Sequence, residues 1–147
     1  MEQINVNALG ALRVTHALIH AVLKSFDQLV VNISSEAASM TDCKKDSQFG
    51  YCMSKAALNM ASCLILNGIR EKGGAVINLH PGWMQSVIGE PADCDAPYVE
   101  PAEPGEVKYY TTPEITARGF IRILEEPERF SGRLPGFVNY RGDKMNW

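Results

Sequence analysis

The stretch that decides the fold begins with QLVVNISS at residues 28–35 and resumes, after a polar loop, with FGYCMSKAALN at residues 49–59. The first part is a short β-branched run of the kind that forms buried strands in parallel sheets. The second part opens an apolar segment of helical length, which we expect to end near Arg70, just before two glycines. A strand that ends in two serines is therefore followed by a helix that begins with Tyr51 and Lys55.

The same alternation of helix and strand extends on both sides of this stretch. Periodicity, caps and proline stops predict helices over residues 8–26, 49–70 and 112–126, and strands over residues 28–34, 75–79 and 136–140. Five prolines between residues 90 and 113 predict a long loop. Strands that alternate with long helices indicate right-handed crossovers, so we expect an α/β fold with a parallel sheet covered by helices.

Three strands are few for such a sheet. A doubly wound nucleotide-binding fold has about six strands, and its glycine-rich phosphate loop follows the first of them. The twelve glycines here are scattered, and none forms a G-x-G-x-x-G or G-x-x-x-G-x-G motif between a strand and a helix. We therefore expect residues 1–147 to form a single partial domain, the C-terminal part of a Rossmann-type doubly wound parallel sheet without its N-terminal dinucleotide-binding half.

Composition and charge narrow the class of protein. The 147 residues are 46% hydrophobic and 21% charged, which is ordinary for one globular domain, and the net charge is −3. Without a basic face or a long apolar run, neither nucleic acid nor a membrane is expected as a partner. The four cysteines match no zinc or redox spacing, which predicts reduced thiols and a cytoplasmic protein. His16 and His20 stand one helical turn apart without a third ligand, so no metal site is predicted.

Tyr51 and Lys55 are the strongest candidates for chemistry. Their spacing of four places both side chains on one face of a helix, about one turn apart. A free tyrosine, with a pKa of about 10, is a poor acid at neutral pH, but a nearby ammonium and the positive end of a helix favour its phenolate. Taken alone the pair is weak evidence, because Y-x-x-x-K arises by chance in roughly one chain in four of this length. A solvated pair at a helix start would look the same.

Other candidates lie near strand ends and helix starts. Ser34 and Ser35 close the first strand at its carboxyl edge, where open α/β sheets bind ligands, although each alone is equally well interpreted as a cap. Asn7 lies near the start of the first helix, where a plain N-cap is the simpler interpretation. Residues 81–83, PGW, follow the second strand and by themselves indicate a turn, and Ser86 by itself indicates nothing.

These motifs are stronger evidence for a function when their order along the chain is considered. The chain spells NALG from Asn7, NISS at the end of the first strand, YCMSKAALN at the start of the helix and HPGWMQS after the second strand. This ordered set resembles the short-chain dehydrogenase/reductase family, and the likeness runs from Ile4 to Trp147. The ending SGRLPGFVNYRGDKMNW is similar to that of carbonyl-reductase-like members of the family.

The resemblance implies an oxidoreductase that acts on carbonyl and alcohol groups of a small molecule and uses NAD or NADP. Tyr51 would be the general acid in reduction, and Lys55 would lower the pKa of Tyr51 and hydrogen-bond the nicotinamide ribose. Ser35 would hold the substrate oxygen, and Asn7 would position a water that links Lys55 to solvent.

The resemblance also assigns a cofactor-facing segment after the second strand. Pro81, Gly82 and Trp83 would pass beside the nicotinamide, and Ser86 would stand where the family has a carboxamide-binding threonine. Residues 89–113 would cover the substrate as a lid, with an irregular surface excursion as the plainer alternative. The residue that selects NAD or NADP would precede Asn7, so the choice between them is not readable here.

Two departures from the family pattern bear on function. Sixteen residues separate Ser35 from Tyr51, about three more than is usual in the family, which indicates an insertion around residues 42–46. The family's phosphate loop is missing. A catalytic half that needs the missing part for activity therefore stands against a non-catalytic remnant that serves as a dimerisation module. Helices 8–26 and 49–70 would form the interface of a homo-oligomer. A sugar-nucleotide epimerase, which shares the Tyr/Lys pair, is the weaker alternative because no substrate domain follows the last strand.

Overall fold

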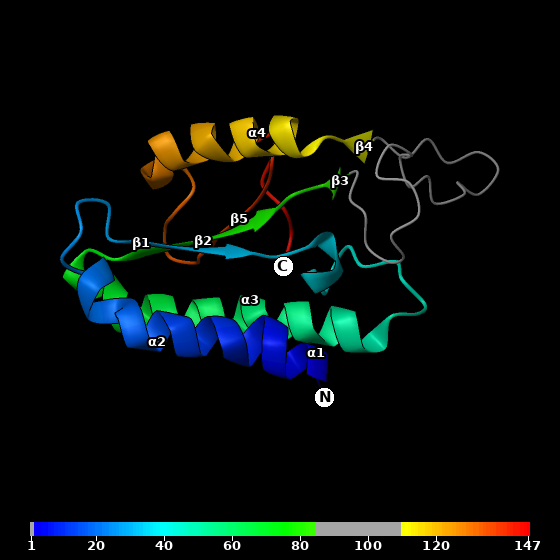
Figure 1. Ribbon diagram of the computed structural model, residues 1–147, viewed down its shortest axis with the longest axis horizontal. Helices are drawn as coiled ribbons and strands as arrows, with labels where there is room; N and C mark the ends of the chain where they lie inside the picture. Colours follow the sequence, from blue (N-terminus) through cyan, green and yellow to red (C-terminus); the bar gives the residue numbers. More distant parts are fainter. Residues whose placement is uncertain (1, 85–109) are drawn as a thin grey trace.

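The computed structural model describes residues 2–84 and 110–147, and it shows a three-layer α/β sandwich (Figure 1). Strands β1 (Leu29–Ile33), β2 (Ala75–His80) and β5 (Gly136–Asn139) form one parallel sheet in the order β1-β2-β5. Helices α2 (Ala11–Val22) and α3 (Phe49–Ile69) cover one face of this sheet, and α4 (Pro113–Glu125) covers the other. The predicted α/β fold with three parallel strands and three main helices is confirmed.

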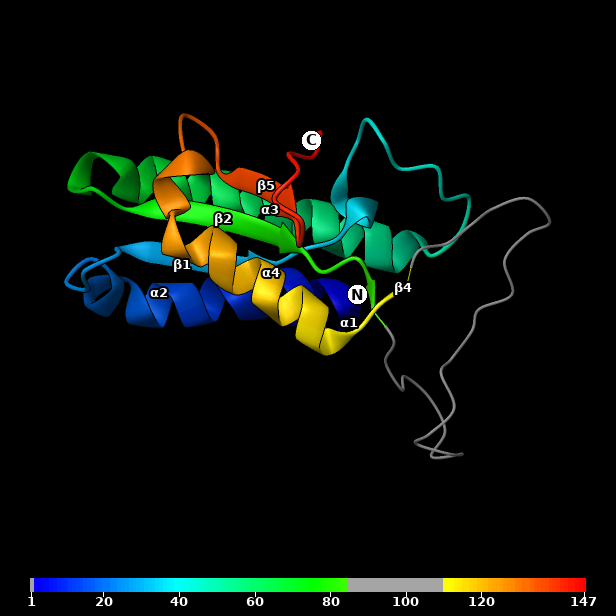
Figure 2. The ribbon, with the colours of Figure 1, turned by 90° about the horizontal axis from the view of Figure 1, so that it is seen from above.

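Each face of the sheet has its own apolar core, because successive strand residues point to opposite faces. Figure 2 shows the sheet with α4 lying over it and with α2 and α3 on the far side. The core facing α2 and α3 consists of Val30, Leu66, Ile69 and Val76, and the core facing α4 consists of Ile77, Leu79, Ile123 and Val138. The neighbours Val76 and Ile77 are both fully buried, so β2 is covered on both faces, as its continuous apolar run predicted.

Polar side chains also lie in the interior, between the sheet and α3. Asn32 of β1 and Asn78 of β2 stand in register. Ser62 of α3 accepts a hydrogen bond from Asn32 Nδ2 at 2.9 Å and donates one to Asn78 Oδ1 at 2.7 Å. Asn78 Nδ2 and the Ser34 hydroxyl both donate to Asn59 Oδ1, at 3.1 and 2.7 Å. These five residues, which we call the amide–serine network, are at most 7% exposed, so their hydrogen bonds form in a low dielectric and hold α3 to the sheet.

The first helix begins earlier and ends earlier than the predicted residues 8–26. It runs as α1 (Glu2–Ile4), a π-helical segment η1 (Asn5–Gly10) and α2, which ends at Val22. The chain leaves the helix there because the Ser25 hydroxyl donates to the Val22 carbonyl oxygen at 2.7 Å and accepts from the Gln28 amide at 3.2 Å. A π-helical turn inside an α-helix is rare and is frequently found at functional sites.

Short elements complete the architecture. Single 3₁₀ turns follow β1, α3 and α4, as η2 (Glu36–Ala38), η3 (Arg70–Lys72) and η4 (Pro127–Arg129). The loop predicted for residues 90–113 lies mostly outside the described residues, and its end differs from the expectation. There β4 (Tyr110–Thr111) pairs in parallel with β3 (Trp83–Met84). A strand of two residues has no periodicity, which is why the sequence did not indicate it.

Helix α4 begins as predicted. The Thr112 hydroxyl accepts a hydrogen bond from the Ile115 amide at 3.3 Å, and Pro113 occupies the first turn, where its missing N–H costs nothing. Gly119 lies in the middle of this helix, where glycine is normally unfavourable. A Cβ at Gly119 would lie 2.0 Å from the Tyr140 carbonyl oxygen, so only glycine lets α4 pack this closely on the chain after β5.

One helical stretch differs from the expectation that no segment could cross a bilayer. By length and composition alone, Phe49–Lys72 passes as a membrane-crossing helix, with a mean hydropathy of 1.2 over its most apolar window. In the fold this stretch is α3 and the turn after it. Its Asn59 and Ser62 side chains are buried and hydrogen-bonded to the strands, so we interpret it as a core helix.

Two glycine substitutions in helices should have opposite effects on stability. Gly119→Ala places a methyl group against the Tyr140 carbonyl oxygen and should lower the free energy of unfolding by about 1–3 kcal/mol. Gly68→Ala, in α3, faces open space and should raise it by up to about 1 kcal/mol, because alanine is the better helix former. Urea denaturation of both variants measures the difference. Equal shifts would contradict the close packing of α4 on Tyr140.

Candidate active site

The predicted catalytic residues gather where the strands end and α3 begins. β1 ends at Ile33, directly before Ser34 and Ser35, and Tyr51 and Lys55 lie in the first two turns of α3. Lys55 Nζ donates to the Ile33 carbonyl oxygen at 2.8 Å and lies 5.9 Å from the centre of the Tyr51 ring. This bond ties the start of α3 to the carboxyl end of β1. The carboxyl edge of an open α/β sheet is where such folds bind their ligands.

Lys55 is partly withdrawn from water. Burial disfavours the ammonium and lowers the pKa of Lys55 below its ordinary value. Among residues 2–84 and 110–147, the Ile33 carbonyl oxygen is the one hydrogen-bond acceptor of the Lys55 ammonium, which has three N–H donors. The remaining donors suit neutral oxygen acceptors such as sugar hydroxyls.

The two serines have different surroundings. Ser34 is 2% exposed, and its hydroxyl is consumed by Asn59 in the amide–serine network. Ser35 caps η2, where its Oγ accepts a hydrogen bond from the Ala37 amide at 3.1 Å. That bond leaves the Ser35 hydroxyl hydrogen for another acceptor. The geometry therefore favours Ser35, the second of the pair, as the residue that could hold a substrate oxygen.

Asn7 lies inside the π-helical segment η1, so the plain N-cap interpretation was wrong. Its Nδ2 donates to Ser54 Oγ at 3.0 Å, and the Ser54 hydroxyl donates to the Tyr51 carbonyl oxygen at 2.7 Å. Ser54 is fully buried, which makes this chain a fixed link between the first helix and the start of α3. Asn7 thus lies within two hydrogen bonds of the Tyr51 backbone.

The turn after β2 is built for close packing. The Pro81 carbonyl oxygen accepts from Thr116 Oγ1 of α4 at 3.0 Å. Gly82 has φ +76, and a Cβ there would lie 2.7 Å from the Tyr140 ring. The sequence therefore needs glycine at this position. Trp83 begins β3, and Lys45 Nζ lies 4.8 Å from the centre of a Trp83 ring. The predicted Ser86 lies outside the described residues.

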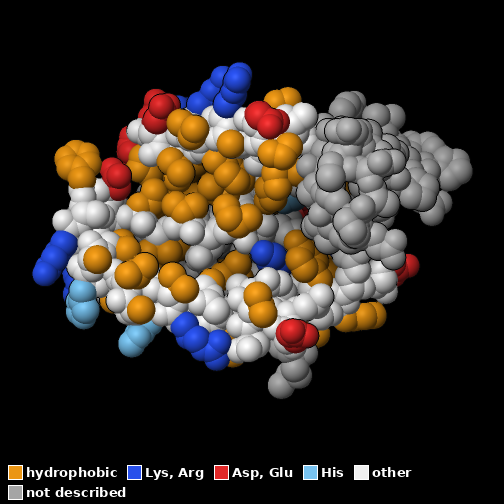
Figure 3. All heavy atoms as spheres, viewed as in Figure 1, with side chains coloured by type: hydrophobic (Ala, Val, Ile, Leu, Met, Phe, Trp, Pro, Cys, Tyr) orange, Lys and Arg blue, Asp and Glu red, His pale blue; other side chains and the backbone are white. Residues whose placement is uncertain are grey.

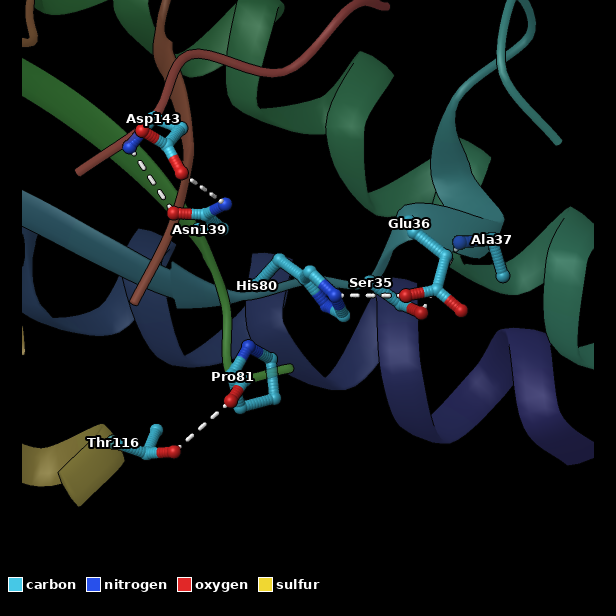
Figure 4. Close-up of polar contacts among 8 residues, drawn as sticks. All are labelled: Ser35, Glu36, Ala37, His80, Pro81, Thr116, Asn139 and Asp143. Carbon is cyan, nitrogen blue, oxygen red and sulfur yellow. Dashed lines mark hydrogen bonds and ion pairs between the residues drawn. The ribbon is translucent and has the colours of Figure 1, made fainter. Parts of the chain in front are cut away.

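Two residues with no role predicted from the sequence, His80 and Glu36, come together beside Ser35. His80 Nε2 and Glu36 Oε2 are 2.7 Å apart (Figure 4). Burial raises the pKa of Glu36, but the hydrogen bond from His80, the charges of His80 and Lys45, and a hydrogen bond from Trp83 together hold it below its ordinary value. Both residues sit directly at the carboxyl end of a predicted strand, and that position was the available signal.

Comparison with known proteins shows which family and which folds this chain resembles. The family described as short chain dehydrogenase matches residues 1–95. C-signal of Myxococcus xanthus is 33% identical over 144 residues, which cover 97% of this chain and 75% of C-signal. The 1-hydroxy-2-glutathionyl-2-methyl-3-butene dehydrogenase of Rhodococcus sp. strain AD45 is 29% identical over 147 residues, which cover 99% of this chain and 57% of that enzyme.

Solved structures show the same relationship. The NADPH-bound carbonyl reductase from chicken fatty liver superimposes with a TM-score of 0.75 at 27% identity, and the match covers 98% of this chain and 55% of that one. A carbonyl reductase from Pseudomonas aeruginosa PAO1 gives a TM-score of 0.71 at 25% identity, covering 98% and 54%. The chain therefore spans about half the length of these structures.

The lowered pKa of Lys55 should make stability depend on pH. Between that lowered pKa and the ordinary value of 10.5, the unfolded chain binds more protons than the folded chain. The free energy of unfolding therefore gains a component that rises with pH over this window. Urea denaturation at a series of alkaline pH values should show a smaller rise in Lys55→Met than in the unmodified chain. Lys44→Met removes a charge from an exposed loop residue and is the control, and an equal loss of slope in both variants would contradict the assignment.

Proposed function

The chain belongs to the short-chain dehydrogenase family, and we propose that it forms the catalytic part of a reductase that moves hydride between NAD(P) and a carbonyl or alcohol group. The observation that carries this proposal is the Lys55–Ile33 hydrogen bond. It sets Tyr51 and Lys55 beside the carboxyl end of β1, where the Ser35 hydroxyl has a hydrogen to donate. Relatives with NADPH bound and with carbonyl reductase activity in their names support the choice of reaction.

The donor set around Lys55 fits the nicotinamide end of such a cofactor. Within the part of the chain that the structure describes, two ammonium N–H groups of Lys55 remain beyond the bond to the Ile33 carbonyl oxygen, and they match the adjacent hydroxyls of a ribose. Pro81 and Gly82 lie at the end of β2 on the same edge of the sheet. When bound, the cofactor would supply or accept the hydride. No glycine-rich phosphate loop occurs in these residues, so they account for the nicotinamide end only.

The roles of the side chains follow from this placement. As the substrate carbon gains hydride, its oxygen gains negative charge and takes the proton of the Tyr51 hydroxyl. The Ser35 hydroxyl donates a hydrogen bond to the same oxygen and stabilises that charge. Lys55 beside Tyr51 favours the phenolate that remains. The Nδ2 bond to Ser54 fixes the Asn7 carboxamide, and Asn7 would position a water that links Lys55 to solvent, so that Tyr51 could regain its proton by way of Lys55.

Loss of one hydroxyl should test this proposal. Tyr51→Phe should lower the rate of NADPH- or NADH-dependent carbonyl reduction by at least about 10²-fold, because it removes the hydroxyl that we propose as the proton donor to the substrate oxygen. The measurement is the loss of nicotinamide absorbance with a panel of aldehydes and ketones, made on the chain supplied with the N-terminal, dinucleotide-binding half of a short-chain dehydrogenase, because these residues contain no phosphate loop. Tyr140→Phe is the matched control, since its hydroxyl bonds Arg141. Reduction that survives Tyr51→Phe would refute the assignment of the acid.

Association through the first two long helices is a second proposed function, and exposed apolar side chains favour it. Figure 3 shows apolar side chains gathered on the face that carries α4, the open edge of the sheet at β1, and α2. Exposed apolar residues include Val14 and Leu18 of α2, at 60% and 53% exposure, and Met60 and Leu64 of α3, at 61% and 64%. Apolar area of this kind is normally covered by a partner.

A charge placed on these helices should reduce association. Leu18→Glu and Leu64→Glu should each shift the sedimentation coefficient towards that of the monomer, because a carboxylate would be buried unpaired in the interface. Leu134→Glu, at a residue that is 56% exposed outside the helices, is the control and should leave the sedimentation coefficient unchanged. A chain that is monomeric before any substitution would exclude this function.

A further inference from the structure

The contact between His80 and Glu36 joins the ends of two neighbouring strands. His80 is the last residue of β2, and Glu36 begins η2, the turn that follows β1. Their side chains are 11% and 32% exposed, and His80 Nε2 lies 2.7 Å from Glu36 Oε2. In Figure 4 the imidazole and the carboxylate point toward each other across the gap between the strands, with Ser35 beside them. A charge-assisted bond of this length is among the stronger hydrogen bonds in proteins.

Two further residues act on the same carboxylate. Trp83, at the start of β3, hydrogen-bonds Glu36, and Lys45 adds its positive charge. Lys45 also lies over Trp83, with 4.8 Å between its Nζ and the ring centre. Lys45 belongs to the segment where the sequence indicated an insertion. The Glu36 carboxylate is thus the point where η2, the end of β2, β3 and the inserted loop meet.

The position of Glu36 determines what the neighbouring serine can do. The Ser35 Oγ accepts the Ala37 amide hydrogen at 3.1 Å, so the direction of its O–H depends on the orientation of the η2 turn. Glu36 lies between the two partners of that bond, and His80 holds it against β2. A turn of three residues has little stability of its own. The contact with His80 therefore supplies an anchor that the turn lacks.

We propose that His80 is a positioning residue that holds Glu36 and thereby aims the Ser35 hydroxyl at the substrate oxygen. This inference rests on the proposed function for its catalytic meaning, while the anchoring of the turn is a property of the chain itself. The contact engages His80 Nε2, and Nδ1 is buried without a hydrogen-bond partner among residues 2–84 and 110–147, so Glu36 is the polar partner that fixes the imidazole.

Amide hydrogen exchange in the full chain tests the anchoring without any need for activity. His80→Leu removes the donor, and the Ala37 amide should exchange about tenfold faster, as expected when one charge-assisted hydrogen bond is lost. His80→Gln keeps an N–H near the position of Nε2 and should restore most of the protection. The Ile77 amide, in the core of β2, should keep its exchange rate in both variants. Asn139→Leu breaks the comparable contact with Asp143 at the end of β5 and should not change Ala37 exchange.

A double variant and separate measurements of kcat and KM complete the test. Glu36→Ala should raise Ala37 exchange as much as His80→Leu, and the pair combined should add little, because both remove the same bond. In carbonyl reduction, His80→Leu should lower kcat about tenfold with KM little changed, and His80→Gln should recover it. If His80→Leu does not fold, Glu36→Gln, which keeps an acceptor but removes the charge, should show the same changes at smaller amplitude.

The outcomes separate the two proposals. Ala37 exchange that responds to His80, in a chain that reduces no carbonyl even when a dinucleotide-binding half is supplied, would support the anchoring and remove the proposed reductase function. If carbonyl reduction depends on Tyr51 but replacing His80 changes neither Ala37 exchange nor kcat, the positioning role alone would be overturned. An unfolding temperature lowered by His80→Leu with unchanged Ala37 exchange would also overturn it, because His80 would then stabilise the fold without directing the turn.

Discussion

The amide–serine network between the sheet and α3 is the constraint on which the rest of the structure depends. Each of its hydrogen bonds contributes only about 1 kcal/mol net, but an amide buried without partners would cost about 1–3 kcal/mol. The main effect of the network is therefore to fix the register of α3 against β1 and β2. Asn32 and Asn78 stand opposite each other in β1 and β2, and Ser62 bridges them, so α3 cannot slide by a turn without stranding buried amides. That register sets where α3 begins and hence where Tyr51 and Lys55 lie.

The register of α3 against the sheet also determines where the residues of the candidate site lie. Ser34, the residue after β1, belongs to the network, whereas the next residue, Ser35, caps η2 and is itself only 7% exposed. Lys55 reaches back to Ile33, and Asn7 reaches through Ser54 to Tyr51. Packing and the candidate site thus use adjacent residues after the same strand and on the same helix. Because Ser34 and Ser35 are neighbours and both are buried, a shift that disturbed one would also displace the other.

Much of this arrangement was predictable from local patterns. The order of helices and strands follows from apolar runs, caps and proline stops, and the strand bounds agree within one or two residues. The spacing of Tyr51 and Lys55 predicts a shared helical face for any helix that contains them. Three features were not predictable. The π-helical segment around Asn7, the pairing of β3 with β4, and the contact between His80 and Glu36 all depend on segments that meet only after folding.

The sequence by itself determined the alternation of elements and the chemical types present at each strand end, because both are written in local spacing and residue identity. Tertiary structure decided which of those polar residues serve the interior and which serve the site. Ser34 and Ser35 are equivalent in the sequence, yet one is bound to Asn59 and the other caps η2 with a hydrogen to spare. The physical reason is the partner that each hydroxyl meets after folding: Ser34 bonds Asn59 of α3, twenty-five residues away, whereas Ser35 accepts from the Ala37 amide two residues further on.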